Sequence, residues 1–261
     1  MLNIINTVNL TGVTISGTHD DLYEVYEAIE RVLGPEESMD LTSLRILGVC
    51  YDLRHCFMGD REIEFVENSY HEHLQKYHET IHPNTNVHFK VNILWLEIIF
   101  AALALDDFVK RYRDDKIFNK MMKDTGVTDE QKQYYALTRF EDVALVNLFQ
   151  EKVWKAFRDA CGDAAYKRLY KSAKADDFHY TIVCKYNDFC THYLDTLEMK
   201  YIHSKPEKRE KLLATLVRKI IVQGEDYYQI HRDVSAYAIK NNISKDQVRL
   251  ADVDYPEDIE W

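Results

Sequence analysis

The sequence predicts an α+β protein, with a small antiparallel sheet and packed helices in the N-terminal part that continue into a C-terminal helical bundle. Apolar residues alternate with polar ones, the period of a half-buried strand, only between residues 2 and 93. After Lys116 the apolar residues recur at helical spacing. We therefore divide the chain into an α+β portion, residues 1–116, and a helical portion, residues 117–261, which can together form one compact domain.

Residues 2–16 predict two short strands, because loosely alternating apolar residues are punctuated by Gly12 and Gly17. A helix is predicted to begin at Asp20 and to end at Gly34-Pro35. Its apolar face contains Leu22, Val25, Tyr26, Ile29 and Leu33. Residues 42–59 fit either a strand or a helix. We favour a helix, since Thr42 can cap its start and Gly59 can close its end.

Two further segments, Arg61–Val66 and Val87–Ile93, alternate charged or polar residues with apolar ones. Both predict half-buried strands, which would complete an antiparallel sheet of about four strands. The run from Ile93 to Leu105 is apolar but too short to span a bilayer, so it predicts a buried helix. Glu97 is the carboxylate expected to be buried there, whereas Asp106-Asp107 and Asp114-Asp115 are expected to be solvated helix ends.

The C-terminal helices are predicted from apolar stripes and from residues that stop helices. One stripe ends at Gly162, a second extends from Phe178 to Tyr201, and Gly224 separates the last two helices. Ser204 and Glu207 have the spacing of a capping box before one of these helices. The eighteen tyrosines are expected mainly in the core with their hydroxyls at the surface.

The net charge of −11 argues against broad binding to nucleic-acid backbones, although a local basic patch remains compatible with it. An odd count of five cysteines, with no C-x-x-C pair, predicts reduced thiols in a cytoplasm. The pairs Cys190/His192 and Cys56/His55 do not have a recognised metal-ligand spacing. We predict no cofactor, no metal and no membrane segment.

One stretch, His78-Glu79-Thr80-Ile81-His82, spells the H-E-x-x-H motif of zinc hydrolases. That motif needs an unbroken helix, so that both histidines reach one metal while the glutamate polarises its water. Pro83 follows directly and disfavours a helical conformation at His82. We therefore predict that His78 and His82 do not share a metal, and we keep a metal-dependent hydrolase as an alternative function.

The densest polar cluster lies at the predicted junction between helix and strand, and it contains Arg54, His55, Asp60, Arg61 and Glu62. Arginines at such a junction can hold a carboxylate or a phosphate, which makes a small-anion site at Arg54 and Arg61 a second alternative. The same residues can instead pair with one another and with Asp52, and so join the helix to the strand. This internal pairing is the interpretation we favour.

The strings Cys50-Tyr51-Asp52-Leu53-Arg54-His55 and Gly59-Asp60-Arg61-Glu62-Ile63-Glu64-Phe65, with Asn9-Leu10-Thr11-Gly12 and Ile15-Ser16-Gly17 upstream, resemble a bacterial family of domains of unknown function. The resemblance covers about the first 110 residues. It implies a soluble bacterial protein and no particular activity, so no catalytic residue follows from it.

From these observations we expect a binding or regulatory protein that acts through contacts with a partner protein or with a second copy of itself. The acidic segment from Ala251 ends in Trp261. We expect the ring of Trp261 to pack against protein, because burying an indole offsets the entropy lost in ordering the segment.

Overall fold

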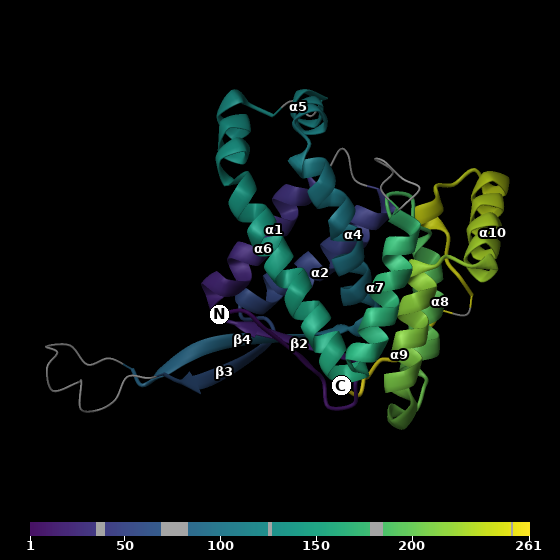
Figure 1. Cartoon of the computed structure of the whole chain (residues 1–261), viewed down its shortest axis with the longest axis horizontal. Helices are drawn as coiled ribbons and strands as arrows, with labels where there is room; N and C mark the ends of the chain where they lie inside the picture. Colours follow the sequence, from purple (N-terminus) through teal and green to yellow (C-terminus); the bar gives the residue numbers. More distant parts are fainter. Residues whose placement is uncertain (35–39, 69–82, 125–126, 178–184, 252) are drawn as a thin grey trace, which may run out of the picture.

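The structure, a computed structural model, describes residues 1–34, 40–68, 83–124, 127–177, 185–251 and 253–261. Within these ranges, β1 (Asn3–Asn6), β2 (Gly12–Gly17), β3 (Glu62–Glu67) and β4 (Thr85–Leu94) form an antiparallel sheet in the order β1-β2-β4-β3. Ile4, Ile15 and Val91 lie side by side in the register and are buried under the helices. The predicted α+β class is confirmed. Figure 1 shows the β3–β4 ribbon projecting from the helical body.

Helices α1 (His19–Leu33) and α2 (Leu41–Phe57) confirm the two helices predicted in this region. Gly34 and Gly59 follow them with φ of 87° and 88°, values that glycine adopts without a steric cost. The predicted cap of α2 is wrong. Asp40 caps the helix by accepting a hydrogen bond from the Ser43 N–H at 2.8 Å. The Thr42 hydroxyl instead donates to the Tyr186 carbonyl at 2.5 Å, because α2 is packed against the later segment.

Helix α4 (Trp95–Arg113) is the predicted buried helix, and it contacts α1, α2, α6, α8 and α9. Because helices surround it, one face of its last turns is buried, although Asp106, Lys110 and Arg113 are exposed as expected of a helix end. The expectation that Asp107 is solvated is therefore wrong: Asp107 is 3 % exposed, and its carboxylate accepts a hydrogen bond from the Tyr186 N–H at 2.7 Å.

The remaining described elements are all helices: α5 (Asp115–Asp124), α6 (Asp129–Cys161), α7 (Asp163–Asp177), α8 (Thr191–Ile202), α9 (Pro206–Ile221), α10 (Glu225–Asn241) and the 3-10 turn η2 (Lys245–Gln247). Gly162 and Gly224 separate helices as predicted. The capping box at Ser204 is wrong, since Pro206 begins α9 and the Ser204 hydroxyl donates to the Tyr201 carbonyl. Residues 178–184 of the helix expected from Phe178 lie outside the described ranges; residues 185–190 are not helical, and α8 begins at Thr191.

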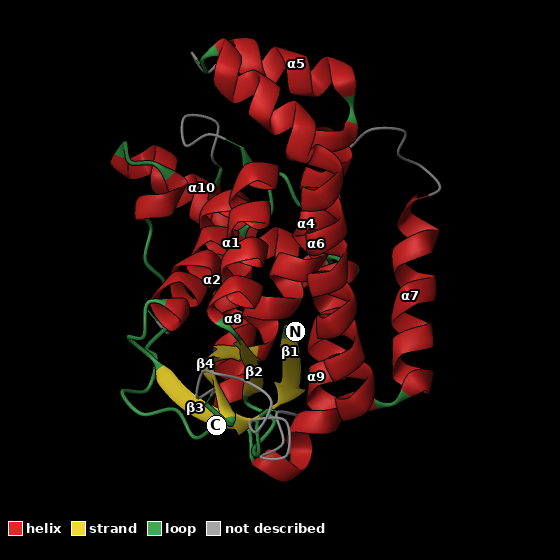
Figure 2. Ribbon diagram, turned by 90° about the vertical axis from the view of Figure 1, so that its left-hand side faces the viewer, coloured by secondary structure: helices red, strands yellow, loops and turns green. Residues whose placement is uncertain are grey.

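One hydrophobic cluster contains buried residues from both sides of residue 116, including Ile15 and Phe100 from the first part and Phe149 and Leu216 from the second. Figure 2 shows the sheet at one end of the upright helices and α7 standing beside α9. The division into two separate units stays a prediction.

Trp261 packs on its own chain, as predicted. Its ring lies against the backbone of Gly12, where an added Cβ would come within 3.0 Å of the indole. The Thr11 hydroxyl donates to the Glu260 carbonyl beside it. The turn between β1 and β2 is thereby joined to the last residues of the chain.

Candidate functional site

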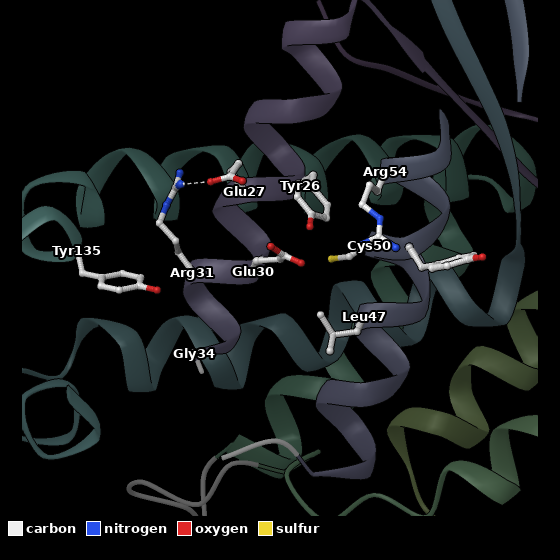
Figure 3. Close-up of a pocket in the computed structure, with 10 residues that line it drawn as sticks. Tyr26, Glu27, Glu30, Arg31, Gly34, Leu47, Cys50, Arg54 and Tyr135 are labelled. Atoms are coloured by element: carbon white, nitrogen blue, oxygen red, sulfur yellow. Dashed lines mark hydrogen bonds and ion pairs between the residues drawn. The ribbon is translucent and has the colours of Figure 1, made fainter. Parts of the chain in front are cut away.

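A groove of about 400 Å³ opens between α1, α2 and α6, and Figure 3 shows its walls. We call it the aromatic groove. The described residues that line it are Tyr26, Glu27, Glu30, Arg31, Gly34, Leu47, Cys50, Tyr51, Arg54 and Tyr135. Its volume lies in the range that small-molecule sites and the recesses of protein interfaces occupy.

The two long walls of the groove come from the faces of α1 and α2 that meet. Tyr26 and Glu30 are one turn apart on α1, and Cys50 and Arg54 are one turn apart on α2. In Figure 3 the Tyr26 hydroxyl, the Glu30 carboxylate and the Cys50 thiol point into the space between the two helices. Polar groups from two helices thus converge on one opening.

Arg31, at one end of the groove, is held inside the protein. Its guanidinium bonds the Asp142 carboxylate of α6 at 2.9 Å and the Glu27 carboxylate at 2.8 Å. Asp142 is fully buried and also accepts a hydrogen bond from the Tyr112 hydroxyl at 2.8 Å. Because its partners already satisfy it, Arg31 fastens α1 to α6 and has few donors left for a ligand.

Arg54, at the other end, is free to bind. Its side chain is exposed, and no described carboxylate forms an ion pair with it. The guanidinium lies over the Tyr51 ring, 5.5 Å from the ring centre, and this contact holds its donors at the mouth of the groove. The groove therefore offers a fixed cation beside an exposed aromatic ring.

The titratable groups of the groove are suited to binding and not to nucleophilic catalysis. Burial raises the pKa of the Cys50 thiol, so it stays protonated at neutral pH and is a poor nucleophile. Burial, and then the Glu30 carboxylate beside it, raise the pKa of the Tyr26 hydroxyl. Among the described residues, no three His, Cys, Asp or Glu side chains are arranged to hold a metal ion.

Most of the predicted polar cluster pairs internally at the junction of α2 and β3. His55 bonds Asp60 at 2.8 Å, and Arg61 bonds Asp52 at 2.9 Å, both on the surface. Glu62 is exposed at the start of β3. Of the five residues in that cluster, the structure brings only Arg54 into the groove. Ligand binding by the other four stays a prediction, as does the proposed small-anion site at Arg54 and Arg61.

The sequence does not predict five of the groove residues as site residues: Tyr26, Glu30, Arg31, Tyr51 and Tyr135. Two pairs of residues one helical turn apart predict a polar face on each helix: Tyr26 with Glu30 on α1, and Cys50 with Arg54 on α2. Nothing in that spacing indicates that the two faces meet. The H-E-x-x-H residues His78, Glu79 and His82 lie outside the described residues.

Residues 2–261 match the family described as a domain of unknown function (DUF6904). The chain belongs to this family. The match covers nearly the whole chain and not only the first 110 residues or so, so the family includes the helical portion as well as the sheet. No curated protein and no solved structure matches the chain. None of the described helices is both long enough and apolar enough to cross a lipid bilayer.

Proposed function

We propose that this protein is a binding protein that recognises a partner protein through the aromatic groove. The observation that carries the proposal is Arg54, which lies over the exposed Tyr51 ring without a carboxylate partner among the described residues. Tyrosine and arginine are enriched where protein interfaces gain most of their binding energy.

The surroundings of the groove support a protein partner over a small anion. Tyr23 and Tyr134 are 42 % and 53 % exposed, and the Tyr23 ring lies 6.5 Å from that of Tyr26. No lysine is among the described lining residues, as is usual at the centre of an interface. Glu27 and Glu30 would repel a small anion, whereas a protein surface can supply a carboxylate for Arg54 and a donor for Glu30.

The proposal can be tested with a photo-crosslinking amino acid at Tyr51 in the cells that naturally make the protein. We expect one adduct of defined mass. Arg54→Glu should weaken the isolated complex by about tenfold or more, because it replaces the cation with a like charge for the partner's carboxylate. Arg158→Glu is the control, since Arg158 also lies over a tyrosine ring, that of Tyr166, outside the groove, where its guanidinium pairs with Glu151.

Failure to form an adduct, or an adduct that Arg54→Glu and Arg158→Glu weaken equally, would contradict the proposal. A measurement of bound zinc distinguishes the alternative function, a metal-dependent hydrolase, from the proposed binding protein. Stoichiometric zinc that is retained after dialysis and lost in His78→Ala would favour the hydrolase.

A further inference from the structure

A second groove, of about 640 Å³, lies between α7 and α9, which stand side by side in Figure 2. We call it the basic groove. Its described lining residues are Cys161, Ala165, Arg168, Leu169, Lys171, Ser172, Glu210, Lys211, Ala214, Thr215 and Arg218. It shares no residue with the aromatic groove.

The charge of this groove is opposite to that of the whole chain. Arg168, Lys171, Lys211 and Arg218 line it together with one acid, Glu210. The chain as a whole has 44 acidic residues and 33 basic ones, so four cations around one cavity are a local reversal. None of the four forms an ion pair with a described residue. All four side chains are exposed, and together they give this surface a positive charge that attracts anions.

Helical spacing directs these cations into the same space. Lys211, Thr215 and Arg218 recur along one face of α9, and Arg168 and Ser172 are one turn apart on α7. The hydroxyls of Ser172 and Thr215 donate to carbonyls of their own helices, at 3.1 and 3.0 Å. The guanidinium and ammonium groups are therefore the donors left for a ligand.

We propose that the basic groove binds a small molecule that carries two or more phosphate groups. The planar guanidinium group of arginine can donate two hydrogen bonds to the oxygens of one phosphate. Cations on two facing helices can therefore each bind a separate phosphate. The described lining contains no aromatic residue, so it has no platform for stacking the bases of a nucleic acid. It contains two lysines, which are depleted in the interfaces of proteins. The composition therefore favours a compact polyanion over a macromolecule.

The experiment is calorimetric titration of the full chain with inorganic tripolyphosphate at low salt. We expect saturable binding of one molecule that weakens as salt increases. The double variant Lys171→Glu/Lys211→Glu should lose about tenfold or more in affinity. The control, Lys167→Glu/Lys208→Glu, makes the same charge change at exposed positions of the same helices outside the groove. It should retain affinity within about twofold.

Absence of saturable binding, or equal losses in the groove and control variants, would overturn the proposal. Tighter binding of single-stranded DNA or of an acidic peptide than of tripolyphosphate would also overturn it. Should the reversal variant fail to fold, Lys171→Gln/Lys211→Gln provides the same comparison with a smaller charge change. Arg54→Glu should bind tripolyphosphate like the wild type, which separates this site from the aromatic groove.

Discussion

Replacing Glu198 by glutamine should stabilise the protein and remove a pH dependence of its stability. Glu198 is fully buried on α8, and its carboxylate accepts no hydrogen bond from a described side chain; the nearby donor is the backbone N–H of Leu96. Arg45 is the nearby cation, but it already bonds Glu97 at 2.7 Å and Asp195 at 2.6 Å. Three carboxylates thus share one guanidinium, and Glu198 is the one without a bond to it.

Burial, and then the like charge of Glu97, raise the pKa of Glu198 well above its usual 4.5. The folded protein therefore keeps a proton at Glu198 over a pH range in which the unfolded chain has lost it. Stability consequently falls as pH rises from 4.5 to the folded-state pKa. The loss amounts to about 1.4 kcal/mol for each pH unit in that window. Glu198→Gln has no proton to lose, so this part of the dependence disappears.

The assay is urea unfolding of wild type and Glu198→Gln at intervals of one unit from about pH 5 to about pH 8. The advantage of the variant should grow with pH and then level off at the folded-state pKa of Glu198. Glu62→Gln, at an exposed position of β3, is the control and should run parallel to the wild type. Parallel curves for wild type and Glu198→Gln would refute the reasoning.

Three further changes have outcomes that follow from the packing. Gly12→Ala places a Cβ 2.0 Å from the carbonyl oxygen of Ile93, so β2 and β4 must separate, and we expect a loss of at least about 2 kcal/mol in urea unfolding. Asp142→Ala leaves Arg31 with Glu27 as its one ion-pair partner among the described residues, and the loss should be about 3 kcal/mol in the same assay. Trp261→Ala removes the ring that covers Gly12 and should lower stability by about 1–2 kcal/mol, measured as a lower melting temperature.

Each of these has a control or a contrary outcome. A stable Gly12→Ala variant would mean that the strands can shift at no cost. Asp159→Ala breaks an exposed pair with Lys155 and should change stability by less than about 1 kcal/mol, so equal losses at Asp142 and Asp159 would contradict the buried network. Removing residues 251–261 without any change in melting temperature would contradict the docking of Trp261.

The helices and strands of this protein were predictable where their signals are local. The alternation in β3 and β4 predicted both strands, but the expectation that β3 is half-buried is wrong, because Ile63 and Phe65 are 50 % and 70 % exposed where the β3–β4 ribbon projects from the helices (Figure 1). Gly34, Gly59 and Gly162 end helices with positive φ, a conformation that their own chemistry favours. Where a competing local signal existed, the prediction failed. Thr42 has the side chain of a cap, but Asp40, two residues before it, is the residue that caps α2.

The candidate sites depended on contacts between distant segments. The sequence identifies Arg54 as a charged residue near a glycine, but it does not show that Arg54 lacks a carboxylate partner among the described residues. That depends on the structure, in which Arg54 lies over the Tyr51 ring and Asp52 pairs with Arg61. Glu97 is expected from its apolar neighbours to be buried; it is half-buried, with 18 % of its side chain exposed, and it pairs with Arg45. Glu198 follows Leu197 of a predicted apolar stripe, yet its burial depends on α4 packing against α8.

The sequence by itself therefore determined the antiparallel sheet, helices α1 and α2, the buried helix α4 and the helical character of the C-terminal part, but it did not predict helices α5 and α7. Strand and helix periods are set by each residue's own side chain and its near neighbours, which makes them readable along the chain. Only the tertiary structure decided that α1 and α2 enclose an aromatic groove, that α7 and α9 place four cations around one cavity, and that Asp107 is buried. Those outcomes depend on which helix faces meet, and that choice is made by hydrophobic burial over the whole chain.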